Sequence, residues 1–274
     1  MKKWWGKAAG FLLVFSLLVT AWPQKAAALT NDTQLIEVEW ESPVAVIGVE
    51  QQEEQFILSA GTPSGRVANF YFSFPKDGGV RFHADEEGYF RPEALQTIQY
   101  SGEEYEDGEK AVVMEAGDTV VRLYIESSPW RFEVYNSEGE LTVSYSADRI
   151  GLGYDEENAL RKVKIASSLA ENEVMFGLGE RFSGFIQNGK TVEMWNTDSF
   201  TQLQKSYGDH NVGYKNIPLL HSSAGYSVFH NNTYYGIVDV GESDPQEYSF
   251  EFYGPILDLY IWTGEPAENI DRYL

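Results

Sequence analysis

The sequence predicts an all-β protein, a large and mostly antiparallel β-sandwich with a short helix beginning at the C-terminus. Apolar and polar residues alternate at every second position in many short runs, as they do in strands with one buried face. Clusters of Gly, Asn, Asp and Pro separate these runs at intervals of roughly ten residues, which is typical of large sandwiches. Helical spacing of apolar residues is confined to the leader and the final segment.

Residues 1–28 are predicted to be a signal peptide and not part of the fold. Lysines near the start form a positive region, Phe11–Ala21 is an apolar run, and Ala26–Ala28 supplies a cleavage motif. The alternative is a retained membrane anchor, for which the apolar run is short. We therefore expect a secreted protein, extracellular or associated with the cell wall of a bacterium, that has no membrane contact after cleavage.

One sandwich domain is predicted over residues 29–262, because no linker, repeat or low-complexity segment interrupts it. The predicted strands and strand pairs lie, in order, in Ile36–Glu41, Tyr71–Ala84, Val121–Glu126, Pro129–Tyr145, Gly225–Gly241, Tyr248–Gly254 and Leu257–Gly264.

Three of these segments carry more detailed expectations. In the first, Ile36, Val38 and Trp40 are expected to face one side and the intervening glutamates the other. The run Asn136–Gly139 predicts a hairpin turn inside Pro129–Tyr145. In the same way, the pair Asn231-Asn232 predicts that Gly225–Gly241 is a hairpin.

Residues 263–274 change to a helical pattern. Pro266 suits the first turn of a helix, and Ile270, Tyr273 and Leu274 share one helical face. We interpret this segment as the start of a helix that leads into a further part of the protein. The alternative is a short helix that caps the sandwich.

Composition excludes several kinds of partner. The chain of 274 residues has a net charge of −22 and contains no cysteine. Strong acidity disfavours nucleic acid and anionic membrane surfaces. Without thiolates, and with four histidines that show no ligand-like spacing, we expect no metal site and no cofactor.

One stretch is poor strand material and is therefore expected to carry function. The sequence FGLGERFSGFIQNGKTVEMWNTDSFTQ, residues 176–202, contains four glycines and an Asn-Thr-Asp cluster. Glycine weakens strands, and Asn and Asp favour turns. We interpret the stretch as two short extended pieces joined by shaped loops, which often hold binding residues.

Four motifs follow one another in the second half of the chain: FGLGERF (Phe176–Phe182), NGKTVEMWNTD (Asn188–Asp198), YKNIPLL (Tyr214–Leu220) and GYSVFHNN (Gly225–Asn232). In this order they resemble glycoside hydrolase family 31. The resemblance implies a galactose mutarotase-like sandwich at the N-terminal side of a retaining α-glycosidase or transglycosylase. The second motif is similar to that of α-xylosidase-like members, although the loop before Tyr214 is longer than the family's short connection.

The resemblance also implies that the catalytic residues lie elsewhere. In this family the nucleophile and the general acid/base are aspartates on a (β/α)8 barrel, and retention requires both carboxyl groups. No alternating strand and helix pattern follows the sandwich. We therefore expect a chain truncated before its barrel and inactive alone, whose partners are that barrel and an α-linked oligosaccharide or α-glycoside.

Asp198 matches the position at which the family's sandwich loop contributes a carboxylate to the sugar site. A carboxylate accepts charge-assisted hydrogen bonds from sugar hydroxyls, but Asp198 is also suited to a turn that bonds its own backbone. Asn196 would add an amide and Trp195 an aromatic wall. A tryptophan beside Met194, however, more often packs in a core.

The neighbouring residues are interpreted as loop-shaping. Glu180 and Arg181 are expected to form an ion pair that fixes the loop, and Gly177 and Gly179 to give it its backbone shape. Lys215 is expected to pair with a nearby acid.

Two other functions remain open from the sequence. One is a stand-alone sandwich that binds carbohydrate without catalysis. The other is an aldose mutarotase-like epimerase, which needs a general base and acid on either side of the sugar ring, usually Glu and His. No arrangement containing His that is similar to the mutarotase pattern occurs in the chain.

Overall fold

The computed structural model describes residues 36–88, 94–105, 108–181, 184–196, 213 and 215–274. Residues 39–274 form one compact unit, in which the named strand pairs are all antiparallel and build three sheets.

The largest sheet has eight strands. Their order is β13 (Met175–Gly177), β15 (Leu219–Ser222), β16 (Tyr226–His230), β19 (Asp258–Thr263), β5 (Val80–His83), β4 (Val67–Ser73), β3 (Gln55–Gly61) and β2 (Ala45–Gln51).

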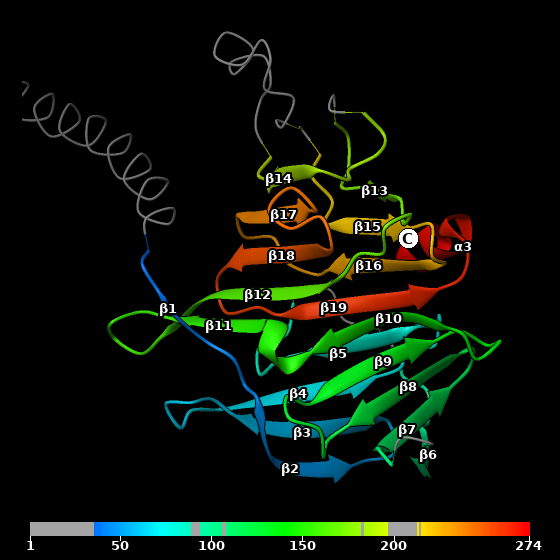
Figure 1. Ribbon diagram of the computed structural model, residues 1–274. Helices are drawn as coiled ribbons and strands as arrows, with labels where there is room; N and C mark the ends of the chain where they lie inside the picture. The colour runs from blue at the N-terminus through cyan, green and yellow to red at the C-terminus, as the bar shows by residue number, and fades with distance from the viewer. Residues whose placement is uncertain (1–35, 89–93, 106–107, 182–183, 197–212, 214) are drawn as a thin grey trace, which may run out of the picture. The chain divides into compact units, whose positions relative to one another are not determined.

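Two smaller sheets complete the architecture. The six-stranded sheet has the order β1 (Glu39–Glu41), β11 (Ile150–Tyr154), β12 (Leu160–Ser168), β18 (Glu247–Tyr253), β17 (Gly236–Val240) and β14 (Lys190–Met194). The five-stranded sheet has the order β10 (Leu141–Ser146), β9 (Arg131–Tyr135), β8 (Thr119–Tyr124), β7 (Lys110–Ala116) and β6 (Gln99–Glu104). In Figure 1 the six-stranded sheet lies above the five-stranded one, and the eight-stranded sheet runs from β13 near the top to β2 at the bottom.

The core lies between the large sheet and the two smaller ones. Phe82 of β5 packs on Phe132 of β9 with ring centroids 4.8 Å apart. At the other end, His230 of β16 stacks on Phe252 of β18 at 4.4 Å. Alternation along the strands directs these side chains inward, so a two-layer sandwich follows from the pattern.

A buried tyrosine cluster joins all three sheets. The hydroxyl groups of Tyr145 (β10) and Tyr248 (β18) lie 2.8 Å apart, and the side chains of Tyr248 and Tyr226 (β16) also share a hydrogen bond. Tyr226 donates to Glu173 Oε1 at 2.7 Å. Burial raises the pKa of all three tyrosines well above its ordinary value, so they remain neutral hydrogen-bonding groups.

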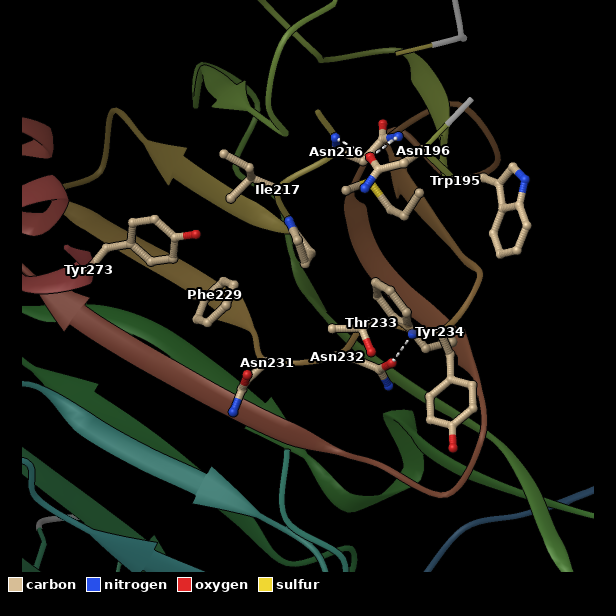
Figure 2. Close-up of a pocket in the computed structure, with 13 residues that line it drawn as sticks. Trp195, Asn196, Asn216, Ile217, Phe229, Asn231, Asn232, Thr233, Tyr234 and Tyr273 are labelled. Carbon is tan, nitrogen blue, oxygen red and sulfur yellow. Dashed lines mark hydrogen bonds between the residues drawn. The ribbon is translucent and has the colours of Figure 1, made fainter. Parts of the chain in front are cut away.

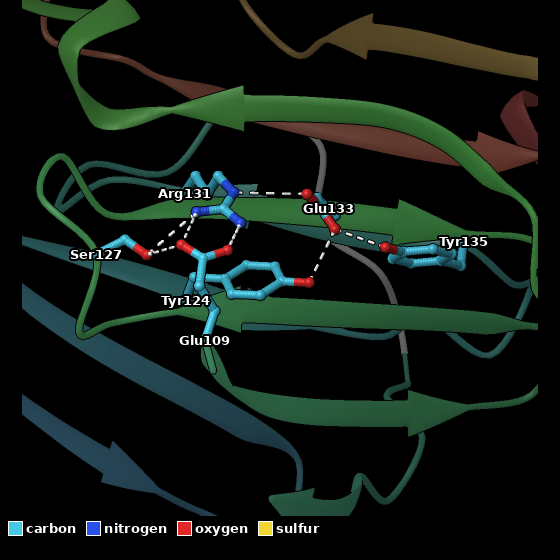
Figure 3. Close-up of polar contacts among 6 residues, drawn as sticks. All are labelled: Glu109, Tyr124, Ser127, Arg131, Glu133 and Tyr135. Carbon is cyan, nitrogen blue, oxygen red and sulfur yellow. Dashed lines mark hydrogen bonds and ion pairs between the residues drawn. The ribbon is translucent and has the colours of Figure 1, made fainter. Parts of the chain in front are cut away.

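The outer face of the five-stranded sheet carries a network of charged and aromatic side chains (Figure 3). Arg131 Nη1 donates to Glu109 Oε1 at 2.9 Å. Glu133 accepts from the hydroxyl groups of Tyr124 and Tyr135 at 3.1 and 2.5 Å. Hydrogen bonding to Glu109 raises the pKa of Arg131. We regard this surface as a stabilising network, because its charges satisfy one another.

Most of the predicted strands are confirmed. Segment 71–84 forms β4 and β5, which pair with Tyr71 opposite His83. The hairpin in Pro129–Tyr145 is β9 paired with β10, and the segment Val121–Glu126 overlaps β8, in which Val121 and Leu123 are buried. Strands β18 and β19 occupy the last two predicted segments.

The predicted hairpin at Asn231-Asn232 is wrong. Strand β16 pairs with β15 and β19 in the large sheet, whereas β17 pairs with β14 and β18 in the six-stranded sheet. The segment therefore crosses from one layer to the other. The asparagines bond across this crossing to neighbouring strands, and a simple turn is not formed: Asn231 N donates to Asp258 O at 2.7 Å.

Strand β1 differs from the expected alternation. Trp40 is 41% exposed, whereas Glu41 is buried. Glu41 accepts hydrogen bonds from Ser64 Oγ at 2.7 Å and from Arg66. Because this ion pair satisfies the carboxylate, the glutamate takes the inward position.

The C-terminal helix is α3 (Pro266–Tyr273), as the sequence predicts. On the predicted apolar face, Ile270 and Leu274 are exposed, whereas Asn269 is fully buried. Asn269 Nδ2 donates to Ser227 Oγ at 3.0 Å, and the Tyr273 ring meets Phe229 edge-on at 5.0 Å. A polar contact thus fixes the rotation of the helix. No helix within the described ranges has the length and apolar character to cross a membrane.

Candidate functional site

A pocket of ≈ 370 Å³ lies where β14, the segment before β15 and the crossing from β16 to β17 meet (Figure 2). Its lining combines amide side chains with aromatic ones: Met194, Trp195, Asn196, Asn216, Ile217, Pro218, Phe229, Asn231, Asn232, Thr233, Tyr234, Phe252 and Tyr273. Among these lining residues there is no carboxylate, imidazole or ammonium group. Such a surface can bind a polyhydroxyl ligand by hydrogen bonds and ring stacking, but it offers no general acid or base.

The backbone beside the pocket turns sharply at three successive residues. Gly177, Leu178 and Gly179 have φ of 126°, 67° and 86°. A Cβ at Gly179 would lie 1.9 Å from the carbonyl oxygen of Lys215, and one at Gly177 would lie 2.4 Å from that of Leu219. Glycine is therefore required at both positions by φ and by close backbone approach. Leu178 adopts this conformation at a cost of about 1–2 kcal/mol, which its complete burial offsets.

The turn places Arg181 where it holds the rim of the pocket. Arg181 Nε donates to Leu178 O at 3.0 Å, and Nη2 donates to Glu193 O at 2.9 Å and to Asn216 Oδ1. Burial lowers the pKa of Arg181 to about 10, so the guanidinium remains charged at neutral pH. Its fixed fork of donors binds several carbonyl-type acceptors at once.

Asn216, which Arg181 holds in place, orients the side chain of Asn196 in turn. Asn196 Oδ1 accepts from the backbone N of Asn216 at 2.7 Å and from Asn216 Nδ2 at 3.0 Å, as Figure 2 shows. An isolated bridge also pairs Asn196 with Gly213. The amide at the end of β14 is thus oriented by contacts that trace back to Arg181.

Trp195 is a surface residue and not a core one. Its side chain is 46% exposed, while the preceding Met194 is buried. The indole meets the Tyr235 ring edge-on at 5.9 Å, and Tyr235 in turn contacts Tyr253 at 5.2 Å. A partly exposed, aromatically supported ring is suited to stacking against a ligand.

The floor of the pocket depends on a buried ion pair. Arg81 Nε and Nη2 donate to the two oxygens of Asp258, each at 2.9 Å. Asp258 Oδ2 also accepts from Asn231 Nδ2 at 2.8 Å. Next to it, Asn232 Nδ2 donates to Ile256 O at 2.9 Å, and Asn232 Oδ1 accepts from Tyr234 N at 2.8 Å. These hydrogen bonds therefore fix the side chains of both Asn231 and Asn232.

The structure confirms the position of some of the predicted site residues and not of others. Trp195 and Asn196 lie together at the pocket. Asp198 falls outside the described residues. Glu180 is exposed, and its Oε2 lies 3.9 Å from Lys215 Nζ. Glu180 is therefore the acid partner expected for that lysine. Arg181 donates to Asn216 and to the carbonyl groups of Leu178 and Glu193. Within the described residues, separate contacts of Glu180 and Arg181 therefore take the place of the expected ion pair between them.

Sequence reasoning missed the lower part of the site. Asn216 is not among the predicted site residues, and Asn231 and Asn232 are interpreted from the sequence as a turn, because asparagine pairs favour turns. The available signal was the position of both asparagines inside the motif GYSVFHNN. Phe229 and Tyr273 could not be assigned to a pocket without knowing that α3 packs on β16.

The described histidines do not form an acid–base site. His83 and His221 bond to Ala84 O and Ser227 Oγ, each at 2.7 Å. Burial lowers the pKa of both, and lowers that of His230 to about 3. His210 lies outside the described residues. The three described histidines are thus buried, whereas an epimerase needs a general acid and base that reach either side of the sugar ring.

The chain is similar to known proteins in sequence and in fold. The family described as the glycosyl hydrolase 31 N-terminal galactose mutarotase-like domain matches residues 30–239. The α-xylosidase XylQ of Lactiplantibacillus pentosus is 27% identical over 170 residues, 61% of this chain and 21% of the xylosidase. An isomaltosyltransferase of Sporosarcina globispora is 22% identical over 242 residues, 84% of this chain and 21% of the transferase. The chain thus spans about a fifth of these relatives.

Solved structures show the same fold. A cycloalternan-forming enzyme from Listeria monocytogenes, in complex with a pentasaccharide substrate, superposes with a TM-score of 0.69 at 22% identity, covering 83% of this chain and 21% of that one. A dextranase of Flavobacterium johnsoniae, complexed with isomaltotriose, has a TM-score of 0.65 at 20% identity, covering 85% and 28%.

Proposed function

Because this chain belongs to the glycosyl hydrolase 31 N-terminal galactose mutarotase-like domain family, we propose that it is the substrate-shaping, carbohydrate-binding domain of an exported retaining α-glycosidase or transglycosylase. The ligand is an α-linked oligosaccharide or α-glycoside. The substrate-binding groups are Trp195, Asn196 and Asp198, and the catalytic carboxylates belong to a (β/α)8 barrel.

One observation carries this proposal. Trp195 and Asn196 lie side by side at the rim of a pocket, and Asn196 is held by hydrogen bonds through Asn216 to Arg181. An amide that is oriented before the ligand arrives loses little freedom on binding. An exposed indole beside it supplies apolar area for a sugar ring. The pattern of an aromatic wall with a fixed polar group is that of a carbohydrate subsite.

We also propose that the isolated chain has no hydrolytic activity. Retaining hydrolysis needs a nucleophile and an acid/base about 5–5.5 Å apart, and the described pocket lining contains neither. We expect no hydrolysis of aryl α-glucosides or α-xylosides by the purified 274-residue chain. Turnover that follows the protein through purification, and that persists in a Trp195→Ala variant, would contradict this expectation.

Binding tests the site itself. We expect the chain to bind isomaltotriose weakly, and Trp195→Ala to weaken binding by about tenfold, which corresponds to 1.4 kcal/mol. Leu141→Ala is a matched control, because Leu141 is exposed on the five-stranded sheet, away from the pocket. Equal binding by both variants would remove Trp195 from the site.

Two further tests address the setting of the domain. Sequencing the DNA beyond codon 274 separates the proposal from a stand-alone binding sandwich, since an open frame encoding a barrel supports the former. Export is tested by expressing the chain in a bacterium: cleavage near Ala28 and recovery outside the cell are expected. Retention of the leader in the membrane fraction would instead support the anchor.

A further inference from the structure

The outer face of the six-stranded sheet carries two adjoining pockets that share no lining residue with the pocket at Trp195. One, of ≈ 370 Å³, is lined by β1, β11, β12, β18 and the 3-10 helix η2 (Ala147–Arg149). The other, of ≈ 210 Å³, is lined by β14, β17 and β18. Lys164, Glu247 and Glu251 line both, so the two form a single depression, here called the outer groove.

An exposed tryptophan lies at one end of the outer groove. Trp40 is 41% exposed on the edge strand β1. Its ring rests on the backbone of β11 at Gly151, where an added Cβ would lie 2.9 Å from Trp40 Cε3. Any larger residue at Gly151 would therefore lift the ring from the strand. A flat indole supported from below and open to solvent can stack on the apolar face of a sugar ring.

The centre of the groove holds two charges that do not neutralise each other. Lys164 and Glu251 are direct partners in the β12–β18 register, yet no ion pair or hydrogen bond joins them in the described part of the chain. Their heads are available as a donor and an acceptor to a ligand between them. Arg149 and Glu247, 3.8 Å apart, add a second pair of opposite charges nearby.

Small residues line the floor of the groove, and the carboxylate of Asp239 lies at the end opposite Trp40. Gly151 and Ala166 line the floor near Trp40, and Ser249 lies on the floor of the adjoining half. Asp239 accepts from Thr191 Oγ1 at 3.0 Å and from Ser243 Oγ at 2.6 Å, which fixes its orientation. Six strands at about 4.8 Å spacing make the face about 24 Å wide, enough for several sugar units.

The mixture of charges selects the class of ligand. The lining carries five carboxylates and two cationic groups, namely Asp148, Asp239, Asp244, Glu247 and Glu251 against Arg149 and Lys164, so a strongly anionic ligand would be repelled. A neutral ligand with many hydroxyl groups can donate to the carboxylates and accept from the ammonium and guanidinium groups. The exposed indole adds the apolar contact that such ligands share.

We propose that the outer groove is a second carbohydrate-binding site, which holds a neutral oligosaccharide across the strands from Trp40 to Asp239. It shares with the proposed function only the class of ligand, because none of its lining residues lines the pocket at Trp195. It serves to hold a polymeric substrate on the protein while one end reaches another site.

Fluorine NMR of the full chain labelled with fluorotryptophan tests the groove directly. The chain contains seven tryptophans, and the signals of Trp40 and Trp195 are assigned by their loss in Trp40→Phe and Trp195→Phe. Titration with maltopentaose and isomaltopentaose is expected to shift the Trp40 signal. Glucose should require at least tenfold higher concentration, because it spans only one part of the groove.

A second set of variants leaves Trp40 in place. Lys164→Met and Glu251→Gln, combined, should weaken the titration at Trp40 at least fivefold with an unchanged melting temperature. Lys110→Met, at an exposed position on β7, is the control and should change nothing.

The outcomes separate the two sites. A shift at Trp40 that the Lys164 and Glu251 variants weaken supports the groove, whatever happens at Trp195. A shift at Trp195 with a constant Trp40 signal overturns the groove and leaves the proposed function standing. Constant signals at both residues contradict both. A Trp40 shift that glucose produces equally well, or that the central variants do not affect, also overturns the proposal, since the ligand would then touch the indole without occupying the groove.

Discussion

His230 places a titratable ring inside the core without a hydrogen-bonding partner. It is fully buried and stacks on Phe252, and neither ring nitrogen has a hydrogen-bond partner among the described residues. Burial lowers the pKa to about 3. The folded protein therefore holds the neutral ring, while the unfolded chain binds a proton below its ordinary value of 6.5.

This difference predicts a loss of stability in mild acid. Because the unfolded state binds more protons between pH 6.5 and 3, the free energy of unfolding falls as pH is lowered, by about 1.4 kcal/mol per unit once below 6.5. Between pH 7 and pH 5 the contribution is about 2 kcal/mol. His230→Phe keeps the stacked ring and should remove this part of the pH dependence in urea unfolding. A variant with the same pH slope as the original protein would show that His230 is not responsible.

Asp198 carries a prediction that its sequence motif alone supports. In a protein that includes the barrel, Asp198→Ala should lower kcat/KM by about ten- to a hundredfold, because a charge-assisted contact is worth roughly 1.5–3 kcal/mol. The melting temperature should change little, as for a surface substitution. The alternative of a turn carboxylate predicts the reverse, so both quantities are measured on the same variant. Normal kinetics with reduced stability would remove Asp198 from the site.

At the scale of elements, the Gly177–Gly179 turn is the part of the site that tolerates least change. Gly179→Ala would place a Cβ 1.9 Å from the carbonyl oxygen of Lys215, so we expect a loss of at least 3 kcal/mol or failure to fold. Gly189 has a φ of 72° but no neighbour within 4 Å. Gly189→Ala should therefore cost only about 1 kcal/mol, the conformational part. Similar losses in the two variants, measured by urea unfolding, would contradict the role of close approach.

The elements also show what the sequence could and could not predict. Alternation and turn residues located β8, β9, β10, β18 and β19, because both signals are local. The crossing at Asn231-Asn232 escaped prediction, since a strand pattern does not specify which sheet the strand joins. The inward position of Glu41 depends on Arg66, which is distant in sequence. The pocket residues Phe229 and Tyr273 meet through tertiary packing alone.

At the scale of the whole unit, the three sheets meet at the tyrosine cluster. Tyr145 comes from the five-stranded sheet, Tyr248 from the six-stranded sheet and Tyr226 from the eight-stranded sheet. Since Tyr248 bonds to both others, its hydroxyl group connects the three sheets inside the core.

Removing that hydroxyl group tests whether it couples the sheets. Tyr248→Phe keeps the buried ring but deprives the Tyr145 hydroxyl group of its partner, and a buried unsatisfied polar group costs about 1–3 kcal/mol. Tyr71→Phe is the control, because no hydrogen bond of its hydroxyl group is found in the described part of the chain, and it should change stability by less than about 0.5 kcal/mol. In Tyr248→Phe,Tyr145→Phe both partners are removed, so part of the lost stability should return. If the double variant is as unstable as the sum of the two single variants, the hydroxyl groups act independently and the cluster does not couple the sheets.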